Sequence, residues 1–589
     1  MSVTAPPAAP RRARGSGYPA LPLRWEVPAV VLAAVLVVGW TNRATLSGLT
    51  TTAGGDLGDP LYFAWQLAWV RHALTSDPGG LWTTPAFLQA PDNLAFTDTV
   101  LGYTPLGLIL PGGQSGALAL LNLAGLTAAV LAVVGGYALA RAMGSGRFAA
   151  LVAGAGAGFA PWRIEQSIHI NVISTGGIAL SLALLSRGNG WSLRHGWRPE
   201  RMSARWIAAG WAVAAYQLTF GFATGIWFLY SLAVPMALWA LGWLISGRRR
   251  ARVPRAVLVA HGLGGLAFLL TLGLLLRPYL RVVDAHPEAK RGEAWLPLFS
   301  PPWRGLLTAP AEDWFWGGRQ ATWRGELSWP PEMILSPGIV LLVLAATGVV
   351  FSIWPWRRRL GLLLATVVVG ILSLGTAFPW GHGEWTYLPL YRYAPGWSAL
   401  RTPGRLMIWV TLGLCLLAAG AVARFYRELR PARLSGARPR TLVMAGTAAL
   451  LAVAPAGVVV GEGLSTQPHW PVARSPVRLA AFRQPILLLP TDLIGDYHMM
   501  LWQTEGWPVL ANGSSGFDPP AQTGLRADAA TFPDAVSVAA LRARGILTVV
   551  LVRSRTPGGP WAGAADVPVT GLGITRRDFG DAVVYGLSP

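Results

Sequence analysis

The sequence predicts a polytopic α-helical membrane protein that ends in a small α/β region. Of its 589 residues, 53% are hydrophobic and 13% are charged, which is about half the charged fraction of a typical soluble domain. Long apolar runs recur between Val27 and about residue 460. Short clusters of arginine separate these runs, as in proteins that cross a bilayer many times.

Eleven apolar segments are candidates for membrane-spanning helices. A spanning helix needs about 20 apolar residues, so the boundaries of the shorter segments are approximate. The segments are Val27–Trp40, 115–141, 147–161, 170–186, 206–222, 224–246, 255–277, 336–354, 359–378, 404–424 and 441–460.

The distribution of positive charge predicts the orientation of the chain. A net charge of +21 is typical of nucleic-acid binding. The arginines, however, lie in short loops between spans, where positive charge marks the cytoplasmic side, so we expect no nucleic-acid partner. The clusters fall within residues 11–24, 187–205, 248–255, 357–359 and 424–440. Their alternation places the N-terminus inside the cell and the C-terminal region outside.

Three regions follow from this orientation. Residues 1–24 are expected to be a disordered, basic cytoplasmic segment, residues 25–460 a transmembrane domain, and residues 461–589 an extracytoplasmic α/β domain. The long loops 42–113, 278–335 and 379–403 then lie outside as well. Because the large loops gather on one face, we expect the function to be carried out on the outer face of the membrane.

The stretch Gly54–His72 places two carboxylates, Asp56 and Asp59, between the first span and an aromatic segment. An enzyme that transfers a sugar from a lipid phosphate needs a carboxylate at headgroup level to take the proton of the acceptor hydroxyl. Asp59 precedes Pro60 and therefore also fits a helix N-cap with proline at the first helical position. Asp56 is thus the better candidate for the base.

The segment Leu61–Leu74 is predicted to be an amphipathic helix that lies flat in the membrane interface. Its tryptophans, Trp65 among them, recur at helical spacing and would sit at the lipid headgroups. Trp65 is a candidate substrate-binding residue, and the alternative is an aromatic anchor without contact to substrate.

A second outer loop, residues 161–171 with the sequence PWRIEQSIHIN, concentrates polar side chains between two spans. Arg163, Glu165 and His169 are candidates for binding a sugar or a pyrophosphate, or for holding a metal ion together with Asp56. A solvated turn would use the same residues. One histidine and one glutamate are too few to establish a metal site, so a divalent metal ion remains open.

Two pairs of arginines lie at the outer ends of predicted spans. They are Arg277 with Arg281 and Arg401 with Arg405. A departing lipid phosphate needs a fixed cation, and arginine binds phosphate in bidentate fashion. The alternative is that these side chains extend to lipid headgroups. Positive charge is otherwise disfavoured on the outer side, which favours phosphate binding.

The C-terminal region reads as strands, helices and one loop rich in turn residues. Pro485–Pro490 is predicted to be a buried strand, 532–545 a helix and 546–552 a strand. The loop between them carries Asn512, a candidate substrate-binding residue. It also carries aromatic side chains that would bind an acceptor glycan or belong to the core, namely Trp502, Trp507 and Phe517.

Several segments together resemble a known family. They are GDLGDPLYFAWQLAWV, PDNLAFTDTVLGYTPL, PWRIEQSIHINVIS, RPYLRV, YAPGWSALRTPGRL, NGSSGFDPP and FPDAVSVAALRARGILTVVLV. The chain is similar in these segments to the GT-C superfamily of polyprenol-phosphate-sugar-dependent glycosyltransferases. Within it, the resemblance is to a group of large bacterial multi-pass membrane proteins.

The resemblance implies an inverting sugar transfer outside the cytoplasmic membrane, with a polyprenyl-phosphate-linked sugar as donor and an envelope glycan, lipid or protein as acceptor. It implies that a first-loop acid is the base, which maps onto Asp56 or Asp59. It also implies a basic residue at the donor phosphate, for which Arg401 and Arg405 are the candidates. The chain lacks a D-x-D motif and a WWDYG-type signature, so neither metal dependence nor a protein acceptor follows.

Two other functions remain as alternatives. One is a transporter or flippase for envelope lipids, although ionisable residues are sparse within the spans and a translocation path usually needs some. The other is a non-catalytic assembly factor that has a GT-C-like fold, because fold analogy does not establish activity.

Overall fold

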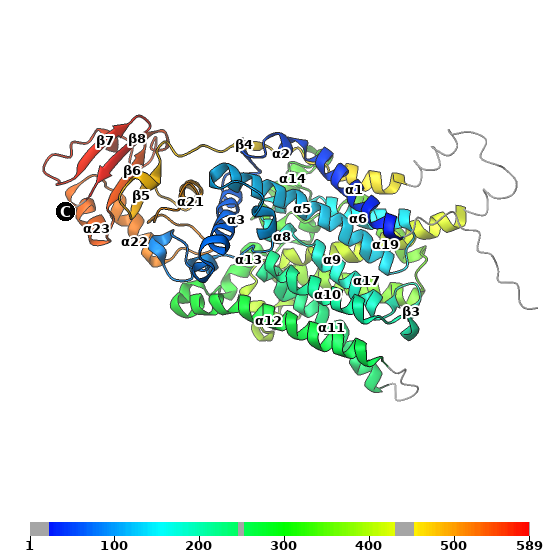
Figure 1. Ribbon diagram of the computed structural model, residues 1–589. Coiled ribbons are helices and arrows are strands. Elements are labelled where there is room, and N and C mark those ends of the chain that lie inside the picture. The colour runs from blue at the N-terminus through cyan, green and yellow to red at the C-terminus, as the bar shows by residue number, and fades with distance from the viewer. Residues whose placement is uncertain (1–22, 246–252, 430–452, 588–589) are drawn as a thin grey trace, which may run out of the picture.

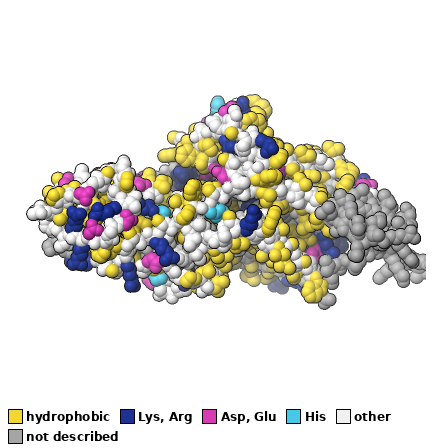
Figure 2. Space-filling view, turned by 90° about the horizontal axis from the view of Figure 1, so that it is seen from above, with side chains coloured by type: hydrophobic (Ala, Val, Ile, Leu, Met, Phe, Trp, Pro, Cys, Tyr) yellow, Lys and Arg dark blue, Asp and Glu magenta, His cyan; other side chains and the backbone are white. Residues whose placement is uncertain are grey.

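The computed structural model describes residues 23–245, 253–429 and 453–587. A body of helices fills most of the molecule, and a four-stranded sheet lies at one end of it (Figure 1). Hydrophobic side chains cover much of the helical body, whereas charged side chains gather over the end with the sheet (Figure 2). The expected disordered N-terminal segment, most of the 248–255 arginine cluster and part of the last predicted span lie outside the described residues.

Five helical segments within the described ranges are long and apolar enough to cross a membrane. They are Gly113–Ala142, Ile170–Gly188, Phe222–Gly242, Arg255–Ala285 and Pro403–Glu428. Three shorter apolar helices are Trp25–Thr41, Ile339–Val350 and Val453–Glu462. The structure is thus a helical protein with several candidate spans, and the number eleven stays a prediction.

The helices of the body correspond closely to the predicted apolar segments. Their bounds are α1 Leu23–Thr41, α5 Gly113–Ala142, α6 Arg147–Phe159, α9 Gly176–Gly188, α10 Ala204–Gln217, α11 Phe222–Ile245, α12 Arg255–Ala285, α16 Ile339–Val350, α17 Trp356–Ser373 and α19 Met407–Leu429. The predicted segment 170–186 is broken into the short helix α8 (Ile170–Ile173) and α9. The break places polar residues of the second outer loop beside the site described below.

Small residues let the central helix α5 approach its neighbours closely. A Cβ atom on Gly135 would lie 2.4 Å from the carbonyl oxygen of Gly176 on α9, and one on Gly136 would lie 2.6 Å from that of Ala153 on α6. Contacts this short exclude any side chain at these positions. Close backbone approach of this kind is a usual way for helices to associate in a bilayer.

A buried carboxylate fixes α1 to the rest of the body. Glu26 is 6% exposed and accepts hydrogen bonds from Arg141 Nε (2.7 Å), Arg147 Nε (2.8 Å) and the Tyr137 hydroxyl (2.8 Å). These partners belong to α5 and α6. One side chain therefore joins three helices. Most of the other side chains of α1 are exposed on the surface of the protein.

The predicted interfacial helix is instead a buried one. Helix α3 (Asp59–Ser76) packs against α5 and α21 (Gly495–Gln503), and Trp65 is fully buried with its Nε1 donating to Gln503 Oε1 at 2.9 Å. The tryptophans therefore pack inside the protein, because apolar residues occupy most positions of the first three turns. How α3 lies relative to the bilayer stays a prediction.

The C-terminal sheet has the strand order β5-β6-β8-β7, with β5 and β6 parallel and the other pairs antiparallel. Leu487 is opposite Val549, and Val550 is opposite Val584. The strands are β5 Ile486–Leu489, β6 Thr548–Val552, β7 Thr575–Phe579 and β8 Ala582–Gly586, and the helices α22 Pro520–Ala529 and α23 Ala535–Ala543 accompany them. The predicted buried strand, helix and second strand are β5, α23 and β6.

The first outer loop and the C-terminal region are joined by backbone hydrogen bonds. Strand β1 (Thr52–Gly54) pairs with β4 (His469–Pro471) in antiparallel fashion. Further along, Leu510 N donates to Pro85 O at 2.8 Å, and Phe87 N donates to Asn512 O at 3.2 Å. The segment before α3 and the segment after it are therefore both held by the C-terminal region.

The ion cluster of α1 gives a prediction for stability. We expect Glu26→Ala to lower the free energy of unfolding by about 2 kcal/mol, because it removes charge-assisted hydrogen bonds to two arginines. Thermal unfolding of the detergent-purified protein measures this change. The matched control is Glu428→Ala, which removes an exposed pair with Arg424 and should cost less than about 0.5 kcal/mol. Equal losses in the two variants would contradict the role given to Glu26.

Candidate functional site

The candidate site is built around Asp59, the first residue of α3. Its carboxylate does not cap the helix; the N-cap position is Gly58, and no side-chain cap bond is present there. Instead, Asp59 Oδ2 lies 2.9 Å from His169 Nε2. The other ring nitrogen of His169 lies 3.0 Å from Gln166 Oε1, which fixes the ring plane. The two outer loops predicted to carry functional residues thus meet at this pair.

Asp56 lies at the outer edge of the same site. Its Oδ1 accepts the N–H of Gly58 at 2.8 Å. The residue as a whole is exposed, but partial desolvation of its carboxyl group raises the pKa of Asp56, opposed by the Gly58 bond and reinforced by the Asp59 charge. A raised pKa makes Asp56 the stronger base of the two acids.

The surroundings of Asp59 act in the opposite direction. Burial alone would raise the pKa of Asp59, but the hydrogen bond and charge of His169, followed by Arg405 and Arg401, outweigh burial and lower it. Two neighbouring acids whose pKa values are pushed apart are suited to different roles. Asp59 is the fixed charge, and Asp56 is the acid able to take up a proton.

Arg405 is held by a buried ion pair with Glu332. Its Nε lies 3.1 Å from Glu332 Oε2, and its Nη2 bonds the other carboxylate oxygen. Burial would raise the pKa of Glu332, but Arg405 lowers it overall. This bidentate pairing fixes the guanidinium of Arg405, whose charge also acts on Asp59.

Arg401 and Arg291 add two guanidinium groups that form no ion pair with a carboxylate of the described residues. The guanidinium of Arg401 lies over the ring of Phe299, 4.6 Å from its centre, and within the described ranges no carboxylate pairs with it. Arg291 Nη2 donates to Gly516 O at 3.0 Å. Burial, then Arg401 and Arg405, lowers the pKa of Arg291 to about 9. Mutual repulsion of these groups favours a bound anion.

The C-terminal region contributes a tyrosine to the site. Tyr497 on α21 packs against Tyr62 of α3 with ring centres 5.6 Å apart. Burial, followed by the charge of Asp59, raises the pKa of Tyr497 to about 12. The phenol therefore remains protonated at neutral pH and is able to donate a hydrogen bond.

Asp98 anchors the end of the first outer loop. It is half-buried, accepts a hydrogen bond from the side-chain amide of Asn171 at 2.9 Å and accepts another from the N–H of Phe222 at 2.8 Å. Burial raises its pKa, opposed by these bonds. Asp98 thereby ties the loop to the first turn of α11, close to the arginines.

Glu165 and Arg163, predicted to bind substrate, are not equivalent in the structure. Burial and the neighbouring Glu312 raise the pKa of Glu165 to about 7, and the charge of Asp56 also acts on it. Arg163 is buried on the other side of the loop, where its Nη2 donates to Ile173 O at 2.9 Å. Only Glu165 accompanies His169 at the site.

The pair Arg277 and Arg281 does not belong to the arginine cluster. Both lie on α12, and Arg277 is exposed. Arg281 pairs with Asp92, with Nε 2.7 Å from Oδ2. The pair with Asp92 already engages the guanidinium of Arg281, and the phosphate role assigned to Arg277 and Arg281 stays a prediction.

Trp65 and Asn512 lie in the core of the structure. Trp65 has no exposed surface. Asn512 is also fully buried, and its side chain bonds both backbone groups of Leu488, at 2.7 Å and 2.9 Å. Each residue uses its polar group to hold the core together, and the substrate-binding roles assigned to them stay predictions. Among the described residues, no group of three or more His, Cys, Asp or Glu side chains is arranged to hold a metal ion.

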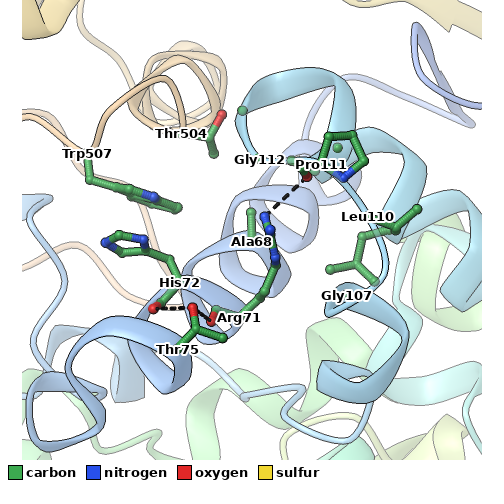
Figure 3. Close-up of a pocket in the computed structure, with 14 residues that line it drawn as sticks. Ala68, Arg71, His72, Thr75, Gly107, Leu110, Pro111, Gly112, Thr504 and Trp507 are labelled. Atoms are coloured by element: carbon green, nitrogen blue, oxygen red, sulfur yellow. Dashed lines mark hydrogen bonds between the residues drawn. The ribbon is translucent and has the colours of Figure 1, made fainter.

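A separate cavity of about 230 Å³ lies further along α3 (Figure 3). Arg71 and His72 line it, and His72 stacks on Trp507 with ring centres 5.2 Å apart. The twelve residues from Asp59 to Arg71 span about 18 Å of helix, so this cavity is not part of the Asp59 site. Trp507 is the predicted aromatic that reaches it, since Trp502 is buried and Phe517 packs against Phe96.

Arg291 and Tyr497 were not among the site residues predicted from the sequence. An arginine in a long outer loop, where positive charge is disfavoured, was a usable signal for Arg291. Tyr497 carried no local signal, because only the packing of α21 on α3 brings it to the site.

No protein-family model and no curated protein matches the chain. Solved structures do. A variant of the arabinofuranosyltransferase AftD from Mycobacteria is similar with a TM-score of 0.51 and 16% identity, over 97% of this chain and 42% of that chain. The oligosaccharyltransferase AglB from Archaeoglobus fulgidus, in complex with an inhibitory peptide and a dolichol-phosphate, is similar with a TM-score of 0.46 and 13% identity. The match covers 90% of this chain and 70% of that chain.

The chain has the GT-C fold. The resemblance expected from the sequence is confirmed at the level of the fold alone, because a fold shared at such low identity does not establish a function.

The two neighbouring arginines give opposite predictions for stability. We expect Arg405→Met to lower the free energy of unfolding by about 3 kcal/mol, since it leaves Glu332 buried without a partner. Arg401→Met should be neutral or stabilising, because it removes a repelled cation that has no carboxylate partner. Thermal unfolding of both variants in detergent checks this contrast. Similar losses in both would contradict the assignment of free positive charge to Arg401.

Proposed function

We propose that the chain is a membrane glycosyltransferase that moves a sugar from a polyprenyl-phosphate donor to a cell-envelope acceptor on the outer face of a bacterial cytoplasmic membrane. One observation carries the proposal. A carboxylate at the start of α3 lies beside a cluster of guanidinium groups, of which Arg401 has no carboxylate partner among the described residues. Such a site is suited to an anionic leaving group next to a catalytic acid.

The arginines have distinct tasks in this proposal. Arg401 and Arg291 bind the donor phosphate, whose negative charge grows as the glycosidic bond breaks. Fixed cations aimed at developing charge are usually the largest contribution to catalysis. Arg405 is neutralised by Glu332, so its task is to hold the charge arrangement around Asp59.

Asp56 is the general base of the transfer. It takes the proton of the acceptor hydroxyl while the hydroxyl oxygen bonds the anomeric carbon. The bond from that carbon to the phosphate oxygen breaks at the same time, and its electron pair leaves with the polyprenyl phosphate. Attack from the face opposite the leaving group inverts the configuration. Asp59 and His169 hold the loop that carries the base.

The fold and the charge distribution support an outer location. The site lies where the first outer loop, β4 and α21 meet, and all three belong to regions that the positive charges predict to be extracytoplasmic. The acceptor is an envelope glycan, lipid or protein that reaches this surface.

Release of polyprenyl phosphate from a panel of polyprenyl-phosphate sugars, with envelope extract as acceptor, measures the activity without knowledge of the product. We expect Asp56→Asn to lower the turnover number about 10² to 10⁴-fold, because it removes the base. Arg401→Gln should raise the KM for the donor.

The matched control is Asp77→Asn, which changes another exposed acid of the first loop away from the site and should leave turnover unchanged. Normal turnover in Asp56→Asn would refute the base assignment. Lipid scrambling in vesicles without any sugar transfer would refute the proposed glycosyltransferase activity.

The pH dependence of the same assay tests the raised pKa of Asp56. A base works only when deprotonated, so activity should fall on the acid side as Asp56 takes up a proton. Because its pKa is raised, the midpoint should lie above the ordinary aspartate value of about 3.9. An acid limb at or below that value would contradict the assignment.

A further inference from the structure

A second cavity lies behind the Asp59–His169 pair, at the outer ends of candidate membrane spans. Its volume is about 160 Å³. Its wall is apolar and includes Leu126 and Phe159, whereas its rim carries the polar side chains of Thr45, Gln467 and His469. An apolar wall with a polar rim matches the two ends of a membrane lipid.

This cavity, called the groove from here on, shares its wall with the candidate site. Pro60 and Ile168 line the groove, and each is the chain neighbour of one member of the Asp59–His169 pair. A molecule whose apolar part lay in the groove would therefore hold its polar end within a short distance of the two acids.

The groove also contains a buried cation. Arg163 lines it, is 6% exposed, and makes its hydrogen bonds to Ile173 O and Thr175 Oγ1. No carboxylate within the described ranges pairs with it. Burying an unpaired charge costs free energy that an oxygen-rich head group would offset.

The side of the groove formed by α5 is open. Gly125 lines the groove, and a Cβ atom built there would meet no atom within 4 Å. Its neighbours Leu126 and Ala129 are half-buried on a helix long and apolar enough to cross the membrane. A lipid chain therefore has room to enter from the bilayer.

We propose that this groove binds the apolar chain of a membrane lipid with an oxygen-rich head, and that this lipid carries the acceptor hydroxyl. The second part rests on the proposed glycosyltransferase function. Arg291, Arg401 and Arg405 do not line the groove, so the donor phosphate and the groove lipid occupy separate places. The two lipids meet at the acids between them.

The site is tested by photolabelling. The full chain in nanodiscs is irradiated with phosphatidylglycerol that carries a diazirine on its acyl chain, and labelled peptides are identified by mass spectrometry. We expect labels within 121–129 and at Phe159. Gly125→Leu fills the open space and should lower this labelling at least tenfold. The matched control, Gly273→Leu, changes a glycine of α12 that also faces open space and should leave it unchanged.

Absence of label in the groove, or equal labelling of wild type and Gly125→Leu, would overturn the site. The acceptor role is tested by counting sugar transferred to the organic-extractable fraction, where Gly125→Leu should lose most of the transfer and Gly273→Leu none. Undiminished transfer in Gly125→Leu would overturn that role alone. No transfer by the wild type would overturn the proposed function, whereas the labelling would still decide the groove.

Discussion

The charge balance around Asp59 is the constraint on which the rest of the site depends. One carboxylate faces a histidine and two arginines, and a third arginine lies close enough to be repelled by them. Glu332 forms an ion pair with Arg405 and thereby lowers the free-energy cost of burying the arginines together. Arg401 has no such partner among the described residues, and arginine is a common ligand of phosphate.

Distant segments of the chain enforce this arrangement. The first outer loop is held by β4 on one side and by residues 510–512 on the other, and the buried Trp65–Gln503 bond joins α3 to α21. Helix α21 also brings Tyr497 to the acids. Although it belongs to the C-terminal region, α21 is part of the floor of the site. The membrane body and the C-terminal region therefore act as one structure here.

Much of the fold followed from local patterns, and much of the site did not. Apolar runs and arginine clusters predicted the helices, and β5, α23 and β6 were readable from a buried run, a capped helix and a second run. The sequence predicted that the loops carrying Asp59 and His169 lie on the same face, but it did not predict the contact between the two side chains. Trp65 and Asn512 looked functional because their types suit sugar binding, but long-range partners at Gln503 and Leu488 use them in the core. Likewise, the partner of Arg281 is Asp92, which is far away in sequence and could not be inferred from the local pattern.

Phosphate binding at this site is tested by an experimental structure of the full chain with polyprenyl phosphate bound, reconstituted in nanodiscs. We expect density for the phosphate in contact with the guanidinium groups of Arg401 and Arg291, beside Asp59. Density for the phosphate at Arg277 and Arg281, or at the opposite end of the helical body, would contradict it.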